Sequence, residues 1–245
     1  MAIGKGLLAL AIAALVAGGV FAQARVSVGG GVAFNGGSLG GMSVDYRAIK
    51  GPKVSNSVSH VGLGGFVFLD AVYAELSLGF GGGPLSVAWK EQPENPYSRN
   101  GRAKIGSFTA LDIGLLGKFP IALGDGRISV FPLFGFAYSM VVGIKDNDGK
   151  KMFESEYGDY EYILESDLDN YRLQFGVGTD LGISDNLYLR IQGLGHYRFA
   201  NKYFKYMVKE AELASAGSNY GRPAIEAKAT GGFGATVAFA VGYKF

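Results

Sequence analysis

Two histidines, His60 and His196, are the side chains best suited to acid–base chemistry, because imidazole titrates near neutral pH. With a serine and an acid, such a histidine could serve a lipid-modifying, acyl-transferring enzyme. Ser59 and Ser139 are candidates only by residue type, since no serine–histidine–acid spacing is specific. With no Cys and only 2 His, the chain offers few ligands for a metal centre. We therefore predict no enzyme, no catalytic or metal site and no cofactor, with both histidines in a polar network.

Acidic residues concentrate between Gly143 and Asn170, which contain nine of the 21 acids. Asp146-Asn147-Asp148-Gly149 is similar to the start of a calcium loop, but Tyr157 stands where an EF-hand requires its twelfth-position Glu. We expect solvated charge here, with an extracellular ligand as the alternative. The acidic loop residues are Asp146, Asp148, Glu154, Glu156, Asp159 and Glu161.

The composition excludes several classes of protein. Hydrophobic residues make up 48% of the chain, which rules out intrinsic disorder. The absence of Cys rules out disulfide frameworks and thiol chemistry. A net charge of +2 gives no electrostatic reason to expect nucleic-acid binding. The 40 Gly are more than twice the usual share of about 7% and must fit beside this hydrophobicity.

Residues 1–24 have the pattern of a cleavable signal peptide. Lys5 precedes an apolar run from Leu7 to Val16, and the segment ends in Ala22-Gln23-Ala24. The run is shorter than the roughly 20 residues of a membrane-spanning helix, and no later segment is long enough either. The predicted domain is therefore 25–245, and any membrane crossing within it must use strands.

Bulky apolar residues alternate with small or polar residues along the rest of the chain, which is the pattern of half-buried strands. The eight alternating segments cover about residues 26–34, 61–69, 72–80, 105–119, 128–140, 171–181, 187–199 and 233–245. A two-residue turn at Asp70-Ala71 would pair Leu63 with Leu78, and a later tight turn would pair Asp180 with Arg190. Both pairings keep apolar residues opposite apolar residues and polar opposite polar.

The connections between these segments alternate in length, which is typical of outer-membrane barrels with long extracellular loops. Three are short, and the other four span about residues 35–59, 83–103, 143–170 and 200–230. In the last of these, the segment from Lys202 to Leu213 is compatible with either a short helix near the mouth or a solvated loop. Together these features predict an all-β fold, an eight-stranded antiparallel up-and-down transmembrane β-barrel with four long extracellular loops.

The face opposite the bulky apolar residues is mostly glycine, serine and alanine, which suits a narrow lumen better than a water-exposed surface. The apolar face is therefore predicted to point outward, toward outer-membrane lipid. The few charges on the small-residue face would form a lumen polar network of Glu75, Asp112, Arg172, Asp180, Arg190, His196 and Arg198. Asp180 can pair with Arg190, whereas Arg172 opposite Arg198 would need an acid such as Asp112. Such a network either locks a filled barrel or lines a narrow path.

The signal segment, eight strands, tight turns and terminal aromatic residue together resemble the small bacterial outer-membrane barrels of the OmpA, OmpX and OmpW type. The ending Val237 to Phe245 is similar to the C-terminal signal of that family, with Tyr243 and Phe245 in its pattern and Ala240 where Gly is usual. The resemblance implies the bacterial outer membrane as location and the barrel-assembly machinery as a partner. Ala17 to Gln23 is similar to spirochaetal signal peptides.

Three functions follow from this architecture. We predict a structural or surface-interaction role exercised through the long loops. A small passive channel for apolar or small solutes, similar to OmpW, is the alternative, and a lipid-modifying barrel enzyme is the third.

Overall fold

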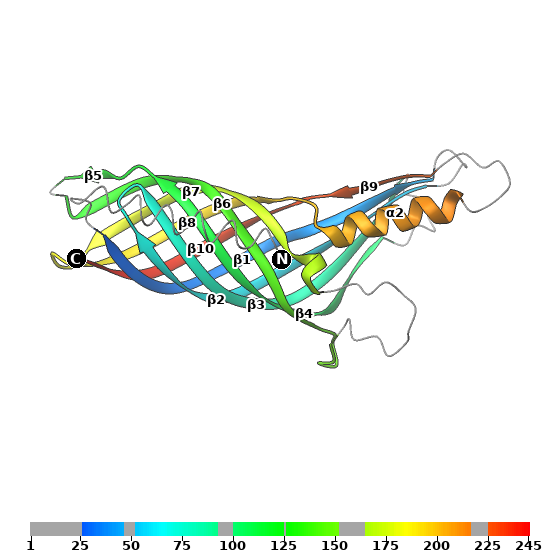
Figure 1. Cartoon of the computed structure of the whole chain (residues 1–245), viewed down its shortest axis with the longest axis horizontal. Helices are drawn as coiled ribbons and strands as arrows, with labels where there is room; N and C mark the ends of the chain where they lie inside the picture. The colour runs from blue at the N-terminus through cyan, green and yellow to red at the C-terminus, as the bar shows by residue number, and fades with distance from the viewer. Residues whose placement is uncertain (1–25, 47–51, 93–99, 125, 152–164, 217–224) are drawn as a thin grey trace.

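In the computed structural model, eight long strands wrap into a barrel (Figure 1). It describes residues 26–46, 52–92, 100–124, 126–151, 165–216 and 225–245, so the predicted signal peptide at 1–24 lies outside the described residues. The long strands are β1 (Ser27–Asp45), β2 (Lys53–Asp70), β3 (Ala74–Gln92), β4 (Gly101–Lys118), β6 (Ile128–Lys145), β7 (Asn170–Gly182), β8 (Leu187–Arg198) and β10 (Gly232–Lys244). The shorter elements are β5 (Ile121–Leu123), β9 (Glu226–Thr230), the 3-10 turn η2 (Glu165–Leu168) and the helix α2 (Lys202–Ala216).

The sheet closes on itself because β1 pairs with both β2 and β10. Every long strand is antiparallel to its two neighbours, in the order β1-β2-β3-β4-β6-β7-β8-β10. Closure leaves no free edge along this ring, so the backbone groups of each strand can be satisfied within the protein. The prediction of an eight-stranded antiparallel up-and-down barrel is confirmed. None of the helices in the described ranges is long and apolar enough to cross a bilayer.

Bulky apolar side chains cover the outside of the barrel, as the alternation predicts. Exposed examples occur on every long strand, among them Phe34, Val67, Phe80, Phe134, Val177, Leu189 and Phe239. Aromatic residues form contacts at both limits of this belt: Tyr197 with Phe233 at one, and Tyr243 with Phe245 at the other. An apolar belt bounded by aromatic residues is the exterior that a lipid bilayer covers.

The β7–β8 hairpin has the predicted register, with Asp180 opposite Arg190. The β2–β3 hairpin does not. Leu63 lies opposite Gly82 instead of Leu78, because the chain turns over Ala71 to Tyr73 instead of at Asp70-Ala71. The shift is four residues, an even number, so each side chain keeps its face and the hydrophobic pattern cannot distinguish the two registers. The longer turn lets Asp70 end its strand with its side chain buried.

Val72 in this turn has a φ of 63°, the only positive φ of a non-glycine residue in the described chain. A β-branched side chain is strained in the left-handed region. We expect Val72→Gly to raise the free energy of unfolding by about 1 kcal/mol. Urea unfolding of the detergent-refolded protein, followed by circular dichroism, measures the change. Val72→Ala should gain less, and a loss of stability in Val72→Gly would contradict the strained turn.

The strands are longer than a bilayer requires. Five of them, β1 to β4 and β6, have 18 or 19 residues, whereas about 9–11 residues cross a membrane. We call the end with the tight turns and Phe245 the short-turn end, and the other the long-strand end (Figure 1). The predicted long loops at 35–59 and 83–103 are mostly strand, because pairing between neighbouring strands continues where the lipid-facing alternation stops. The segment beginning at Lys202 is helical, as one interpretation predicted, and α2 contacts β9 and β1.

Bulges in β1 and β6 exchange the inward-facing and outward-facing positions of these strands toward the long-strand end. On β1 the register shifts at Leu39, and on β6 at Val142. Val44 and Ile144, which would point outward without the bulges, are 5% and 3% exposed. The barrel therefore has apolar residues outside near the short-turn end and apolar residues inside near the long-strand end. This second arrangement is that of a water-soluble barrel.

Candidate functional site in the barrel lumen

The short-turn end of the lumen is filled by a group of charged and polar side chains around Arg190. Arg190 donates from Nε to Asp180 Oδ1 at 2.6 Å and from Nη2 to Asp70 Oδ2 at 2.6 Å. Its Nη1 donates to Glu75, and Lys118 forms a close ion pair with Asp70. We call this group, made of Asp70, Glu75, Lys118, Asp180, Arg190 and Gln192, the Arg190 cluster. Strands from opposite walls contribute to it, so it fastens the barrel across its interior.

Aromatic rings surround the Arg190 guanidinium. The Phe68, Phe131 and Tyr188 ring centroids lie 4.7, 5.2 and 5.1 Å from Cζ. Arg190 is 1% exposed, and Phe131 is completely buried. Rings at this distance attract a cation through their electron-rich faces. Together with the three carboxylates they hold the guanidinium in the middle of the lumen.

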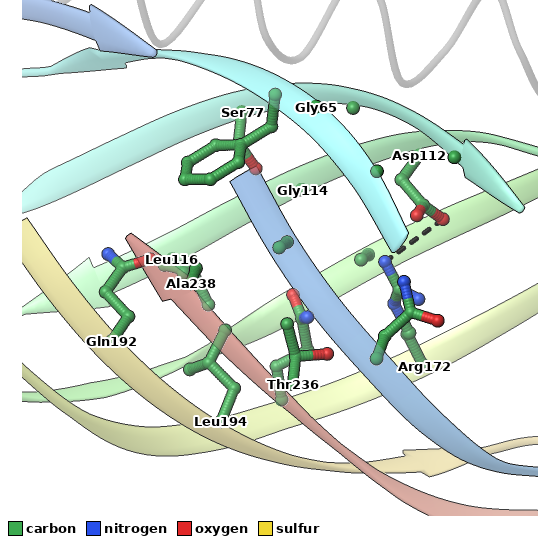
Figure 2. Close-up of a pocket in the computed structure, with 18 of the residues that line it drawn as sticks. Gly65, Ser77, Asp112, Gly114, Leu116, Arg172, Gln192, Leu194, Thr236 and Ala238 are labelled. Carbon is green, nitrogen blue, oxygen red and sulfur yellow. Dashed lines mark ion pairs between the residues drawn. The ribbon is translucent and has the colours of Figure 1, made fainter. Parts of the chain in front are cut away.

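An apolar layer follows the Arg190 cluster toward the barrel centre. It consists of Leu116, Phe131, Leu133 and Leu194, all nearly inaccessible. Beyond it lies a cavity of about 80 Å³, shown in Figure 2. Glycines, among them Gly79 and Gly114, line part of this cavity, and Gln192 and Arg172 contribute polar groups. Because glycine has no side chain, the many glycines on the inner face leave space inside the barrel.

A second polar group lies between the cavity and the long-strand end. Arg172 Nη2 is 3.0 Å from Asp112 Oδ1, an ion pair visible in Figure 2, and Arg198 Nη2 lies 3.1 Å from His60 Nε2. We call His60, Asp112, Arg172, His196 and Arg198 the Arg198 cluster. Arg172 lies directly opposite Arg198 in the β7–β8 register. The two histidines are 2% and 1% exposed.

Apolar side chains close the lumen above the Arg198 cluster. Leu39, Leu85, Phe108, Ala110, Val141 and Ile144 form this group, which we call the apolar cap. Phe108 also packs edge-on against His60, with ring centroids 5.1 Å apart. On the same side of the barrel, α2 buries Phe204 to 4% exposure. The central cavity therefore has a packed layer on each side along the barrel axis.

Comparison with known proteins gives structural likeness only. No protein-family model matches the sequence, and no curated protein matches it. Among solved structures, the outer membrane protein OprG from Pseudomonas aeruginosa is 14% identical, with a TM-score of 0.41, 91% of this chain covered and 96% of that one. The outer membrane protease OmpT from Escherichia coli is 8% identical, with a TM-score of 0.40 and coverage of 90% and 97%. The N-terminal β-barrel domain of Pseudomonas aeruginosa OprF is 13% identical, with a TM-score of 0.31 and coverage of 88% and 97%.

The fold is that of a bacterial outer-membrane barrel. The closed ring of strands and the lipid-compatible exterior together define this fold.

The structure divides the seven predicted lumen residues between the two clusters. Glu75, Asp180 and Arg190 lie in the Arg190 cluster, and Asp112, Arg172, His196 and Arg198 lie in the Arg198 cluster. Asp70, Lys118 and Gln192 complete the first cluster but are missing from the sequence-based prediction. Asp70 was assigned to a turn, and Lys118 and Gln192 were not singled out on their strands. The two-residue alternation could have identified them, because Asp70, Lys118 and Gln192 each occupy an inward-facing position on their strands, as Arg190 does.

The residue arrangement needed for serine–histidine chemistry does not occur among the described residues. His60 contacts Arg198 and Phe108, and neither ring nitrogen of His196 has a hydrogen-bond partner. Ser59, which neighbours His60 in the chain, bonds to the Ser86 carbonyl and to Arg102 instead. Both histidines are also too buried for a lipid substrate to reach.

Two of the predicted acidic loop residues are described. Asp146 Oδ1 accepts hydrogen bonds from the backbone N–H groups of Asp148 and Lys150, each at 2.9 Å. This closes a local turn after β6, so the Asp146 carboxylate has a structural partner. Glu154, Glu156, Asp159 and Glu161 lie outside the described residues. The idea of an extracellular ligand at this loop stays a prediction.

The two aromatic residues of the predicted assembly signal point away from the lumen. Tyr243 on β10 is 47% exposed and Phe245, which follows it, is 73% exposed. The Phe245 N–H donates to the Val26 carbonyl at 3.1 Å, so the last residue lies beside the first described one. Both rings are thus accessible at the short-turn end of the closed seam between β1 and β10.

Proposed function

We propose that this outer-membrane barrel is a closed membrane anchor that presents an interaction surface at its long-strand end. The observation that carries the proposal is the filling of the lumen. The Arg190 cluster and the inner apolar layer lie on one side of the central cavity, and the apolar cap lies on the other. Eight strands enclose an interior just wide enough for side chains, so these layers suffice to block it.

The extended strands supply the interaction surface in this proposal. Beyond the apolar belt their exposed residues include charged side chains, as at Lys90, Arg102 and Lys104. Helix α2 adds the exposed Lys202, Lys205 and Lys209. At the long-strand end the apolar cap lies inside the barrel, so this part of the barrel is stable outside lipid. A loop without regular structure would not need such an apolar interior. We also propose that the barrel-assembly machinery recognises Tyr243 and Phe245 at the seam between β1 and β10.

A conductance measurement tests the closed lumen. Purified protein inserted into planar lipid bilayers is expected to give no discrete conductance steps above the lipid baseline. The combined variant Arg190→Ala, Phe131→Ala, Arg198→Ala, Phe108→Ala removes bulk from the Arg190 cluster, the inner apolar layer, the Arg198 cluster and the apolar cap. It should give steps, because water then fills a continuous path. Each single variant should stay silent, since at least one packed layer remains.

Conductance steps in the wild-type protein would contradict the closed anchor. If Ala137→Trp, which adds bulk to the cavity wall, abolished those steps, the passive channel would replace it as the proposed function. Circular dichroism of each variant establishes that silence does not reflect a failure to fold.

A further inference from the structure

Three lysines of helix α2 form one exposed stripe. Lys202, Lys205 and Lys209 are all exposed, and we call them the lysine stripe. At about 3.6 residues per turn, their positions lie within roughly 60° of one another around the helix axis. The buried side of the helix carries Phe204, which is 4% exposed and packs over Gly40 of β1, where an added Cβ would lie 3.1 Å from its ring. The lysine stripe therefore points away from the barrel.

The lysine stripe does not stabilise its own helix. Lys202 and Lys205 both lie in the first turn of α2. The N-terminus of a helix carries a partial positive charge, which disfavours cations in the first turn. The N-terminal cap is instead the neutral Asn201, whose Oδ1 accepts a hydrogen bond from the Phe204 N–H at 3.1 Å. Cations placed against the helix dipole are better explained by an anionic partner outside the helix.

Helix α2 begins at the aromatic limit of the lipid-facing belt. Phe199 is 43% exposed and precedes Lys202 by only three residues. The Phe199 ring centroid lies 5.3 Å from that of Tyr197, which in turn lies 5.0 Å from that of Phe233. We call these three rings the aromatic platform. Aromatic residues in such a position mark the level of the lipid headgroups, so the first turn of α2 lies at that level.

The lysine stripe and the aromatic platform lie on the same wall of the barrel. Tyr197 and Phe233 face each other in the pairing of β8 with β10. The pairing of β10 along β1 is continued by β9, and α2 follows β8 in the chain and contacts β9. The helix therefore stands above the β8–β10 pair that carries the platform.

The helix leads from the membrane surface outward. Figure 1 shows α2 extending beside β9, away from the short-turn end. At about 1.5 Å of rise per residue, Lys202 and Lys209 are about 10 Å apart along the helix axis. The headgroup layer on each side of a bilayer is roughly 5–8 Å deep. The lysine stripe thus passes through the headgroup layer, and the aromatic platform reaches the upper part of the acyl chains.

We propose that the lysine stripe and the aromatic platform together bind an anionic phospholipid. The lysine ammonium groups donate charge-assisted hydrogen bonds to the phosphate oxygens of the headgroup, and the rings pack against its acyl chains. A zwitterionic lipid carries its own cation and gains less from the stripe. This proposal names the partner of one part of the interaction surface proposed above, and it rests on the position of that surface beyond the apolar belt.

Phosphatidylglycerol is the probe, and phosphatidylcholine with the same acyl chains is the zwitterionic comparison. Native mass spectrometry of the full protein in an uncharged maltoside detergent gives the dissociation constant of each lipid. The wild type should bind phosphatidylglycerol at least tenfold more tightly. The variant Lys202→Gln, Lys205→Gln, Lys209→Gln should weaken phosphatidylglycerol binding at least tenfold, since each lysine near a headgroup contributes about fivefold. Its affinity for phosphatidylcholine should not change.

A matched variant locates the effect. Lys145→Gln, Lys150→Gln, Lys151→Gln removes the same charge from exposed positions at the end of β6 and should keep the wild-type preference. Phe233→Ala removes an exposed ring of the aromatic platform and should weaken the binding of both lipids. Glycerol phosphate, which has the headgroup chemistry without acyl chains, should not displace phosphatidylglycerol. Circular dichroism of each variant establishes that it is folded.

Three results would overturn the proposal. These are equal affinities of the wild type for the two lipids, an equal loss in the two triple variants, and displacement by glycerol phosphate, which would assign the stripe to free phosphate. None of them changes the conductance expected of a closed lumen, so this proposal and the closed anchor can fail separately.

Discussion

Arg190→Met is expected to lower the free energy of unfolding by about 3–5 kcal/mol, because it leaves several buried carboxylates without their main cation. Arg190 contacts Asp70, Glu75 and Asp180 and is 1% exposed. Methionine preserves much of the volume, so the loss reflects charge and hydrogen bonding rather than a cavity. Urea unfolding of refolded protein in detergent, followed by circular dichroism, measures the change.

A matched control and a rescue variant make this result specific. Arg102→Met removes an exposed arginine that donates to Ser59 Oγ and should change stability by no more than about 0.5 kcal/mol. Adding Glu75→Gln and Asp180→Asn to Arg190→Met should recover part of the loss, since fewer buried charges then remain unpaired. If Arg190→Met unfolded like the wild type, the Arg190 cluster would not fasten the barrel.

Leu189→Arg is expected to cost about 2 kcal/mol, because the guanidinium would be placed in the hydrocarbon layer, between its middle and the aromatic residues at the short-turn end. Leu189 lies on β8 between Leu181 and Val241 on the neighbouring strands and is 42% exposed without lipid. Reversible unfolding in lipid vesicles gives the free energy. Leu213→Arg is the matched control, because Leu213 on α2 is 55% exposed and lies outside the apolar belt. Equal tolerance at Leu189 and Leu213 would contradict the outward apolar face.

The sequence predicts which side chains share a face of each strand. It predicts the pairing register between neighbouring strands only in part. Alternation places Leu189 and Arg190 on opposite faces, and the small residues that share the face of Arg190 identify that face as the inner one. The same alternation places Asp180 opposite Arg190 once the turn is located. At Asp70 the same reasoning fails, because an even shift of register preserves every face. What selects the observed register there is Asp70 meeting Arg190 and Lys118 across the lumen, a contact that sequence spacing cannot show.

The long-strand end was not predictable because its physical environment differs. The bulges at Leu39 and Val142 shift the parity by one residue, so a single alternation cannot be followed through them. Beyond them the outward residues need only suit water, and segments such as Lys53 to Ser59 have no regular contrast between faces. Leu39, Leu85 and Ile144 of the apolar cap lie in segments that the sequence analysis predicts as long loops, so the cap was not part of the prediction.

The central claim, a barrel with an apolar face toward lipid and a filled interior, is tested most directly by cysteine scanning of β10. The chain has no Cys, so single cysteines at positions 237 to 241 can carry a spin label without background. Labels at Val237, Phe239 and Val241 should be accessible to oxygen dissolved in the bilayer, and those at Ala238 and Ala240 should be protected from it. Inverted accessibility, or none with a period of two residues, would contradict the account.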